Sequence, residues 1–322
     1  MADLSFTLPA HFGITGVRAK KERGCYFLNT ANGPVKIHKS SSTPKDIIKR
    51  YNFLKKLKNS GFGSTDFILE TPNGLPFVEL GRDLFVMSRF VDGRELDLNS
   101  KEDVFMAVKN LASFHKAAQG IFEDKKISAP APEVFNKQTM FLSTALKQIN
   151  KSKRMSDFDM LTLKNASEFA GYASKAEEII KSTPYLNLHE NAIKKGYVCH
   201  NQIKEENLLV LNNSCFIVNF YDVSSNLQLH DLADFIRRYA RKSEREISAL
   251  EIIKTYDEIL PVSGDAVKIL YALLLYPWPF MKVVASQYSK KRNFTPVGQS
   301  SRMDEVLMEQ KNYNSYINEI KI

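Results

Sequence analysis

The pattern of apolar residues changes near residue 100, and this change constrains the fold more than any other feature. The first ninety residues contain short β-rich runs separated by turn signals such as 29–33 and 71–74. One helical pattern interrupts these runs at 44–60. From about residue 100 the spacing is helical almost to the end, except for a short β-rich stretch at 196–219. We therefore expect an α+β protein.

This pattern also predicts how the chain is organised. A small β-rich N-terminal lobe with one helix is expected at 1–90, and a large helical C-terminal lobe with a short β insert at 91–322. Strands are expected at 24–28, 34–38, 66–69, 77–80 and 83–88. Further helices are expected at 135–150, 156–183, 186–195, 230–242, 244–260, 264–276, 278–291 and 301–319, after a first helical face that begins at Val104.

Positive charge is concentrated in one segment. The 322 residues include 45 Lys and Arg against 36 Asp and Glu, a formal net charge of +9. Residues 18–58 hold twelve of the basic residues and only two acidic ones, Glu22 and Asp46. This segment is expected to contact phosphate or an acidic partner. The solvated face of the helix at 44–60 explains part of the charge, but not the cluster at 18–23. No nucleic-acid-binding motif accompanies it, so no nucleic acid partner is expected.

Targeting signals and cysteine spacing indicate a reducing compartment. The N-terminus has no basic region followed by an apolar run, so no signal peptide is predicted. Cys25, Cys199 and Cys215 are far apart and fit neither a metal site nor a disulfide framework. The most apolar stretch, 269–280, contains two prolines and is shorter than the roughly 20 residues of a membrane span. We expect a buried helix pair there, and no membrane span.

Two segments carry residues typical of a chemical site. The first reads H-N-Q-I-K-E-E-N from His200, and the second is an apolar run that ends V-N-F-Y-D, followed by D-L-A. The spacing of His200, Asn207, Asn219 and Asp231 resembles the aminoglycoside and choline kinase branch of the protein-kinase-like superfamily. That branch carries H-G-D-x-x-x-x-N, then I-D-F or I-D-W, then D-L-A. The resemblance implies a two-lobed kinase-like fold.

The resemblance also implies where the chemistry would sit. The family places its catalytic base on the Asp of H-G-D and its main metal ligand on the Asp of I-D-F. These positions are Gln202 and Asn219 here, and both are amides. An amide is no base at neutral pH, and a neutral carbonyl is a poor substitute for a carboxylate on Mg²⁺. The chain is therefore expected to be a pseudoenzyme. The simpler alternative is that Gln202 and Asn219 are two polar loop residues that never had a catalytic role.

The remaining family positions keep matching residues. The resemblance implies that His200 has a structural role under the loop. It also implies that Asp231 anchors the loop from the start of a helix. Asn207 implies the one intact metal ligand, on a site that we expect to be unoccupied. Lys36 is the candidate phosphate contact, although it also reads as a solvated strand lysine. No glycine-rich loop precedes it, and no Glu follows it on the helix.

Further segments narrow the resemblance to the CotS-type spore coat protein family of endospore-forming bacteria. They are 57–62, 70–74, 85–94, 111–115, 234–239 and 275–280, in order along the chain. The resemblance implies synthesis in the mother-cell cytoplasm, location in the spore coat, and other coat proteins as partners, through the basic face 18–58. No cofactor is expected.

The alternative is an ATP-dependent phosphotransferase of small molecules, similar to aminoglycoside, choline or homoserine kinases. It would use Mg²⁺ and ATP with displaced carboxylates such as Asp222, Glu205 or Glu206. A third possibility is a pseudokinase that still binds nucleotide.

Overall fold

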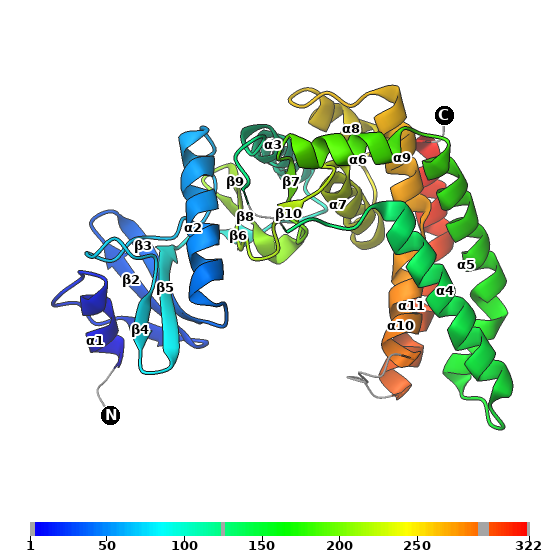
Figure 1. Cartoon of the computed structure of the whole chain (residues 1–322), viewed down its shortest axis with the longest axis horizontal. Helices are drawn as coiled ribbons and strands as arrows, with labels where there is room; N and C mark the ends of the chain where they lie inside the picture. Colours follow the sequence, from blue (N-terminus) through cyan, green and yellow to red (C-terminus); the bar gives the residue numbers. More distant parts are fainter. Residues whose placement is uncertain (1–3, 124–125, 289–295, 321–322) are drawn as a thin grey trace. The chain divides into compact units, whose positions relative to one another are not determined.

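The computed structural model describes residues 4–123, 126–288 and 296–320. The chain forms two compact units (Figure 1). The β-rich unit comprises Met1–Lys126 and Gly196–Ser224, and the helical unit comprises Ile127–Lys195 and Ser225–Ile322. The α+β class is confirmed. The division into lobes at residue 90 stays a prediction. The compact units are a different division, because the β insert belongs to the same unit as the N-terminal sheet.

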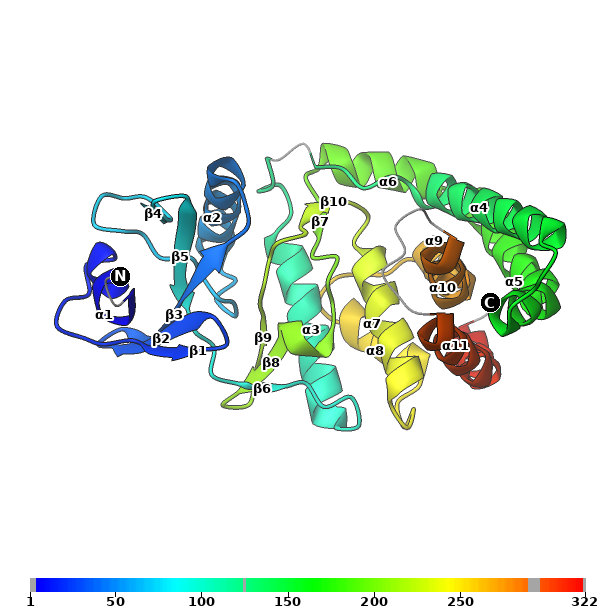
Figure 2. The ribbon, with the colours of Figure 1, turned by 90° about the horizontal axis from the view of Figure 1, so that it is seen from below.

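A five-stranded antiparallel sheet in the order β1-β2-β3-β5-β4 organises the β-rich unit. Its strands are β1 (Lys20–Glu22), β2 (Cys25–Thr30), β3 (Gly33–Ser40), β4 (Val78–Leu80) and β5 (Asp83–Arg89). Side chains alternate along a strand, so Val35 and Ile37 point to one face and Lys36 and His38 to the other. Val35 and Ile37 belong to an apolar cluster with Leu8. Lys36 and His38 therefore belong to the face on which α2 lies (Figures 1 and 2).

Two details of the first ninety residues differ from expectation. The helix α1 (Leu4–His11) was not expected, because its short sequence has no polar and apolar periodicity and its fully buried Leu8 depends on the sheet. The expected strand at 66–69 is wrong, since it makes a single bridge between Ile68 and Ser88. β4 pairs with the first half of β5, so this segment contacts only the last residues of β5.

The helix α2 (Pro44–Asn59) confirms the helix expected at 44–60. The Thr43 hydroxyl accepts a hydrogen bond from the Asp46 N–H, which satisfies one free donor of the first turn. Ile47, Leu54 and Leu57 are buried. Their helical spacing places the apolar side of α2 against the protein and leaves its basic side chains on the other faces.

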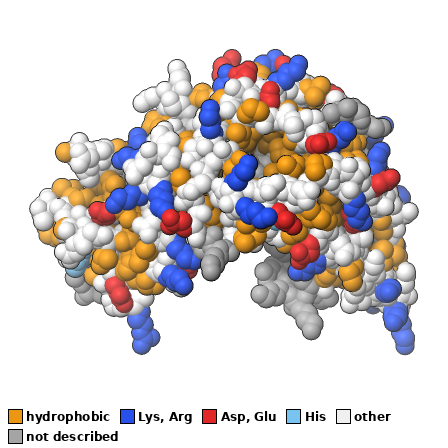
Figure 3. Space-filling model, turned by 45° about the horizontal axis from the view of Figure 1, so that its top comes forward, with side chains coloured by type: hydrophobic (Ala, Val, Ile, Leu, Met, Phe, Trp, Pro, Cys, Tyr) orange, Lys and Arg blue, Asp and Glu red, His pale blue; other side chains and the backbone are white. Residues whose placement is uncertain are grey.

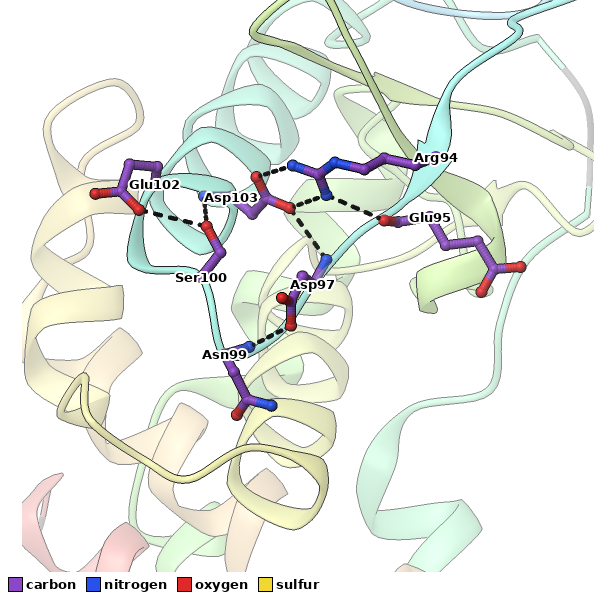
Figure 4. Close-up of polar contacts among 7 residues, drawn as sticks. All are labelled: Arg94, Glu95, Asp97, Asn99, Ser100, Glu102 and Asp103. Carbon is purple, nitrogen blue, oxygen red and sulfur yellow. Dashed lines mark hydrogen bonds and ion pairs between the residues drawn. The ribbon is translucent and has the colours of Figure 1, made fainter.

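An ion pair between an exposed arginine and a buried carboxylate fixes the connection between β5 and the next helix (Figure 4). Asp103 lies in the first turn of α3 (Lys101–Ala117) and is only 2% exposed. Arg94 of β6 (Arg94–Glu95) donates from Nη2 to its Oδ1 at 2.8 Å. The Asp97 N–H donates to its Oδ2 at 3.1 Å. A Cβ added at Gly93 would lie 2.8 Å from a β8 carbonyl oxygen, so only glycine fits there.

The β insert forms a short hairpin next to this connection. Its elements are β7 (Val198–Cys199), the 3₁₀ turn η1 (Glu205–Asn207), β8 (Leu208–Leu211), β9 (Ser214–Ile217) and β10 (Ser224–Ser225). β6, β8 and β9 form a three-stranded sheet. Asn212 and Asn213 join β8 to β9 with φ values of 50° and 54°. This two-residue turn matches the twist of the paired strands, and Asn tolerates it well.

The helical unit contains the remaining helices. They are α4 (Ala131–Lys151), α5 (Asp157–Lys181), α6 (Tyr185–Lys194), α7 (Leu229–Lys242), α8 (Ala249–Asp257), α9 (Gly264–Leu275), α10 (Trp278–Tyr288), α11 (Pro296–Ile317) and the 3₁₀ turn η2 (Asn318–Ile320). These agree with the predicted helices, except that α8 begins later than residue 244, at the capping box of Ser248 and Glu251. Residues 289–291 of the predicted helix at 278–291 lie outside the described residues.

Stacked aromatic rings fill the core of the helical unit. Phe135 stacks on Tyr276 with ring centroids 3.8 Å apart, and Phe169 stacks on Phe280 at 4.1 Å. The stretch Gly264–Tyr288 passes a membrane-span test by length and composition, with mean hydropathy 1.4, but 67% of its apolar window is buried. We assign it to this core, as a pair of helices.

Charges outside the basic segment are mixed in sign. Figure 3 shows one face of the molecule, on which Lys and Arg side chains alternate with Asp and Glu. Most of the ion pairs are exposed, such as Lys194 with Glu190 at 3.9 Å, and contribute little to stability. The net charge of the protein is therefore a property of the segment 18–58.

Candidate functional site

The loop after β7 adopts the backbone that the family motif requires. Asn201, at the position of the family glycine, has φ of 64°. Asn is one of the few residues that tolerate this conformation. Its Nδ2 donates to the Asp222 carbonyl at 2.7 Å and to the Ser224 hydroxyl at 2.9 Å. The fully buried His200 contacts the Val218 carbonyl through Nε2 at 3.0 Å and lies edge-on to Phe220. The loop is thus held by His200 against residue 218 and by Asn201 against residues 222 and 224.

Gln202 lies at the base position of the loop and contacts a carboxylate. Its Nε2 donates to Asp222 Oδ2 at 3.0 Å. Asp222 Oδ1 lies 3.6 Å from the Lys126 ammonium. The carboxylate that the family carries on the loop is replaced here by an amide, and the nearest carboxylate belongs to the following segment. Glu206 pairs instead with Lys204 at 2.7 Å.

Asn207 and Asn219 contact each other directly. Asn219 Nδ2 donates to Asn207 Oδ1 at 2.8 Å, and Asn207 Nδ2 donates to the Gln202 carbonyl at 2.9 Å. The second bond fixes which end of the Asn207 amide faces Asn219. The only side-chain oxygen of Asn207 is therefore engaged by an N–H group, at the place where the family motif implies a cation.

Residues that the family motif implies for Mg²⁺ therefore do not fit the ion. Mg²⁺ prefers anionic oxygen ligands in octahedral geometry, whereas this pair offers two neutral amides bonded to each other. Throughout the described part of the chain, no group of three His, Cys, Asp or Glu side chains is arranged to hold a metal ion.

Lys36 faces a carboxylate that the sequence analysis did not anticipate. Burial raises the pKa of Asp66, and the charge of Lys36 acts in the opposite direction. Asp66 Oδ1 also accepts a hydrogen bond from the Asn219 N–H at 3.2 Å. Asn219 has φ of 67°, a left-handed conformation that Asn tolerates better than most residues. Asp66 therefore contacts the degenerate metal position through the Asn219 backbone.

The space between β3, α2 and residues 219–221 is filled by side chains. The Tyr221 hydroxyl contacts His38 Nε2 at 3.1 Å, and the Arg50 guanidinium lies 4.1 Å from the centre of the Tyr221 ring. Burial, with help from the charges of Lys36 and Arg50, lowers the pKa of His38 to about 4. The cavity that remains among these residues is about 10 Å³, barely enough for one water molecule.

The hairpin above Lys36 is too tight to cover a phosphate group. β1 and β2 are joined by Arg23 and Gly24, with φ of 48° and 81°, and the flanking residues Glu22 and Cys25 are paired. A two-residue turn of this kind leaves no row of free backbone N–H groups, unlike a glycine-rich loop. The β1–β2 hairpin therefore differs from the glycine-rich loop that covers phosphate groups in kinases.

The sequence analysis placed most of these residues but missed some partners. The structure brings together His200, Gln202, Asn207 and Asn219 within the β-rich unit. Asp231 is buried in the first turn of α7, and its role as a loop anchor stays a prediction. The sequence analysis missed the side chains that fill the site, namely Asp66, His38, Arg50 and Tyr221. None of these four had a sequence signal that marked it as part of the site.

The fold defines the class of protein, a kinase-like fold shared with aminoglycoside phosphotransferases. The chain is similar to the aminoglycoside phosphotransferase from Alicyclobacillus acidocaldarius, with TM-score 0.86, 15% identity, and coverage of 97% of this chain and 94% of that one. It is similar to spectinomycin phosphotransferase APH(9)-Ia in complex with ADP and spectinomycin, with TM-score 0.64, 15% identity, and coverage of 96% and 97%. It is also similar to choline kinase from Cryptosporidium parvum, with TM-score 0.53, 14% identity, and coverage of 96% and 90%.

The family is defined by sequence. The model of the family described as "Spore coat putative kinase YutH" matches residues 7–320, and the chain belongs to this family. The resemblance to CotS-type spore coat proteins is confirmed, as is the aminoglycoside phosphotransferase-like fold. The family description associates the chain with the spore coat.

Proposed function

We propose that the protein is a catalytically inactive, kinase-like component of the bacterial spore coat that acts through binding to other proteins. It is made in the mother-cell cytoplasm and then joins the coat. It uses neither ATP nor Mg²⁺. The observation that carries this proposal is the hydrogen bond between the amides of Asn219 and Asn207.

This bond replaces what a cation does in an active phosphotransferase. Mg²⁺ bridges oxygen atoms that would otherwise repel one another. In this chain an N–H group of Asn219 satisfies the Asn207 oxygen instead. The metal position is thus complete without an ion, and its oxygen and N–H groups already hold each other.

The base position supports the same proposal. The Gln202 amide N–H group points at Asp222, so the side chain acts as a donor there. The remaining carbonyl oxygen is not basic at neutral pH. His200 and Asn201 keep the loop in shape, which supports a scaffold retained without the reaction.

Partner binding is assigned to the basic face 18–58 outside α2. Arg18, Lys20, Lys21 and Arg23 are exposed around the β1–β2 hairpin. Exposed charge of one sign speeds association with an oppositely charged partner and is screened by salt. An acidic coat protein is the partner that this face would attract.

One observation favours the alternative, a small-molecule phosphotransferase. Asp222 lies within hydrogen-bonding distance of the base position and is a displaced carboxylate. Its neighbour Lys126 opposes the binding of a cationic alcohol such as choline, the substrate in the name of one structural neighbour. The substrate of such an enzyme would therefore differ from choline.

Thermal unfolding and ATP turnover, measured with and without Mg²⁺, test the proposal. We expect no Mg²⁺-dependent rise in the unfolding temperature and no turnover, because a ligand stabilises only when it binds the folded state. The double variant Gln202→Asp, Asn219→Asp should also remain inactive, since the hairpin and the helix Glu are missing as well.

Two results would contradict it in different ways. Mg²⁺-dependent turnover that disappears in Asp222→Asn would establish the phosphotransferase. Stabilisation by ATP without turnover would establish a nucleotide-binding pseudokinase. The coat role is tested separately: charge reversal at Arg18, Lys20 and Lys21 should reduce the amount of protein in purified coats while leaving its unfolding unchanged.

A further inference from the structure

A large pocket in the β-rich unit lies beside the degenerate site and is not used by the proposed function. Its volume is about 890 Å³, within the usual range for small-molecule sites. One side of α2 forms a wall, residues 121–123 and Lys126 form a second, and Phe220, Tyr221 and Val223 form the third.

The α2 wall presents a stripe of positive charge. Lys45, Lys49 and Lys56 follow the spacing i, i+4 and i+11, which places them on one side of a helix. Arg50 and Lys126 also line the pocket. The first turn of α2 adds the positive end of the helix dipole to the same side. The sequence analysis attributed this charge to a solvated helix face, but the structure separates it: Lys55 and Lys58 lie away from the pocket, against Glu70 and Phe67.

The two acidic residues of the lining do not cancel this charge. Asp46 accepts a hydrogen bond from the Thr43 hydroxyl at 2.6 Å and takes part in the cap of its own helix. Glu123 pairs with Lys56. The lining therefore carries five cationic side chains against two carboxylates. Lys56 is balanced by Glu123 and Lys126 lies 3.6 Å from Asp222, so the excess positive charge comes from Lys45, Lys49 and Arg50. An anion entering the pocket meets a positive potential.

Arg50 is placed to hold an anion rather than merely attract it. Its guanidinium carbon lies 4.1 Å from the centre of the Tyr221 ring, a cation–π contact that holds the group near this ring. Burial lowers the pKa of Arg50, so the surroundings solvate its charge poorly. A planar guanidinium with its N–H groups in a fixed fork suits phosphate and carboxylate oxygens.

Three rings of the lining, one from each wall, contact one another and form an aromatic surface that we call the floor. Phe53 lies edge-on to Phe122 at 5.5 Å and is tilted against Phe220 at 6.1 Å. Ring edges and faces of this kind receive a flat apolar group. The pocket thus pairs an aromatic floor with a cationic wall.

We propose that this pocket binds a small organic phosphate, with the phosphate on the α2 wall and an apolar ring on the Phe53, Phe122 and Phe220 floor. This goes beyond the proposed function, because it needs neither nucleotide nor Mg²⁺. It assigns the α2 part of the basic segment to a small ligand, and the hairpin part to the protein partner.

Calorimetric titration of the whole protein tests this, with phenyl phosphate as the probe and EDTA present. Inorganic phosphate and phenol are titrated alongside, since each carries half of the proposed chemistry. We expect phenyl phosphate to bind more tightly than either, and its affinity to fall with added salt.

A matched pair of double variants locates the site. Lys45→Glu with Lys49→Glu reverses two charges inside the pocket, and Lys21→Glu with Lys58→Glu reverses two outside it, at equal net charge. The first should weaken phenyl phosphate binding by roughly tenfold or more, because each reversed charge acts at close range. The second should change it less than about twofold, because distant exposed charges are screened.

The outcomes decide the proposal directly. Equal loss in both double variants would overturn it, as it would show general attraction by net charge. Equal binding of phenyl phosphate and inorganic phosphate would overturn the role of the aromatic floor. No binding of any probe would overturn the site, while leaving the ATP and Mg²⁺ tests of the proposed function unaffected.

Discussion

Replacing Asn219 with Asp is the sharpest test of the amide pair. In the folded protein Asn219 Nδ2 donates to Asn207 Oδ1 at 2.8 Å, and Asn207 is only 4% exposed. The substitution Asn219→Asp removes the donor and sets a carboxylate oxygen against the Asn207 oxygen. Turning the Asn207 amide around would repair this contact but break its bond to the Gln202 carbonyl. One buried hydrogen bond is lost in either case.

The magnitude follows from this loss and from a neighbouring charge. An unpaired buried acceptor costs about 1–3 kcal/mol. A second acid group beside Asp66, whose Oδ1 accepts from the Asn219 N–H at 3.2 Å, acts in the same direction, because ionising both would bring like charges together. We expect Asn219→Asp to lower the free energy of unfolding by about 2–4 kcal/mol when EDTA is present. Mg²⁺ should restore part of this loss in the variant, by bridging the added oxygen, and should leave the wild-type protein unchanged.

The assay is urea unfolding followed by circular dichroism, with hydrogen exchange to assign the transition to the β-rich unit. Asn213→Asp is the matched control, because Asn213 is exposed in a turn with φ of 54° and tests the same substitution in the same backbone region. If Asn219→Asp and Asn213→Asp unfold at the same urea concentration, the amide pair does not stabilise the site and the reasoning is refuted. A stabilising effect of Mg²⁺ on the wild-type protein would refute it as well.

Three further predictions concern stability. Burial lowers the pKa of both His38 and His230 to about 4, so the folded state keeps them neutral while the unfolded state binds protons below about pH 6.5. The free energy of unfolding should keep its full value above pH 6.5 and fall by about 2–3 kcal/mol per histidine as the pH drops toward 4. In acid titrations of unfolding, His38→Gln should make this pH dependence shallower. Gly93→Ala places a Cβ 2.8 Å from the β8 backbone, so the free energy of unfolding should fall by about 1–3 kcal/mol, and an unchanged urea midpoint would disprove the close approach. Arg94→Ala removes the cation beside the buried Asp103 carboxylate, so the free energy of unfolding should fall at neutral pH and fall less once acid protonates that carboxylate. Equal loss at both pH values would point to packing alone.

Local signals in the sequence determined the fold class and most helices. Periodic apolar residues, caps such as Thr43, and turn residues act over a few positions, so they can be recognised without knowledge of the fold. The spacing of His200, Asn207 and Asn219 indicated the kinase-like loop, because the family motif is fixed along the chain. The same motif showed that an amide, Asn219, stands where the family carries an Asp.

Only the tertiary structure decided what these residues touch. Asn219 and Asn207 form a hydrogen bond across twelve positions, and Asp66 reaches Asn219 from a distant segment. No periodicity records such contacts, since they depend on how the sheet, α2 and the β insert pack. The same reason hid α1, whose helix depends on burial of Leu8 against the sheet. The sequence located the basic segment 18–58. Folding turns one side of α2 toward a pocket and leaves the β1–β2 hairpin exposed, so the positive charge of this segment is divided between two surfaces.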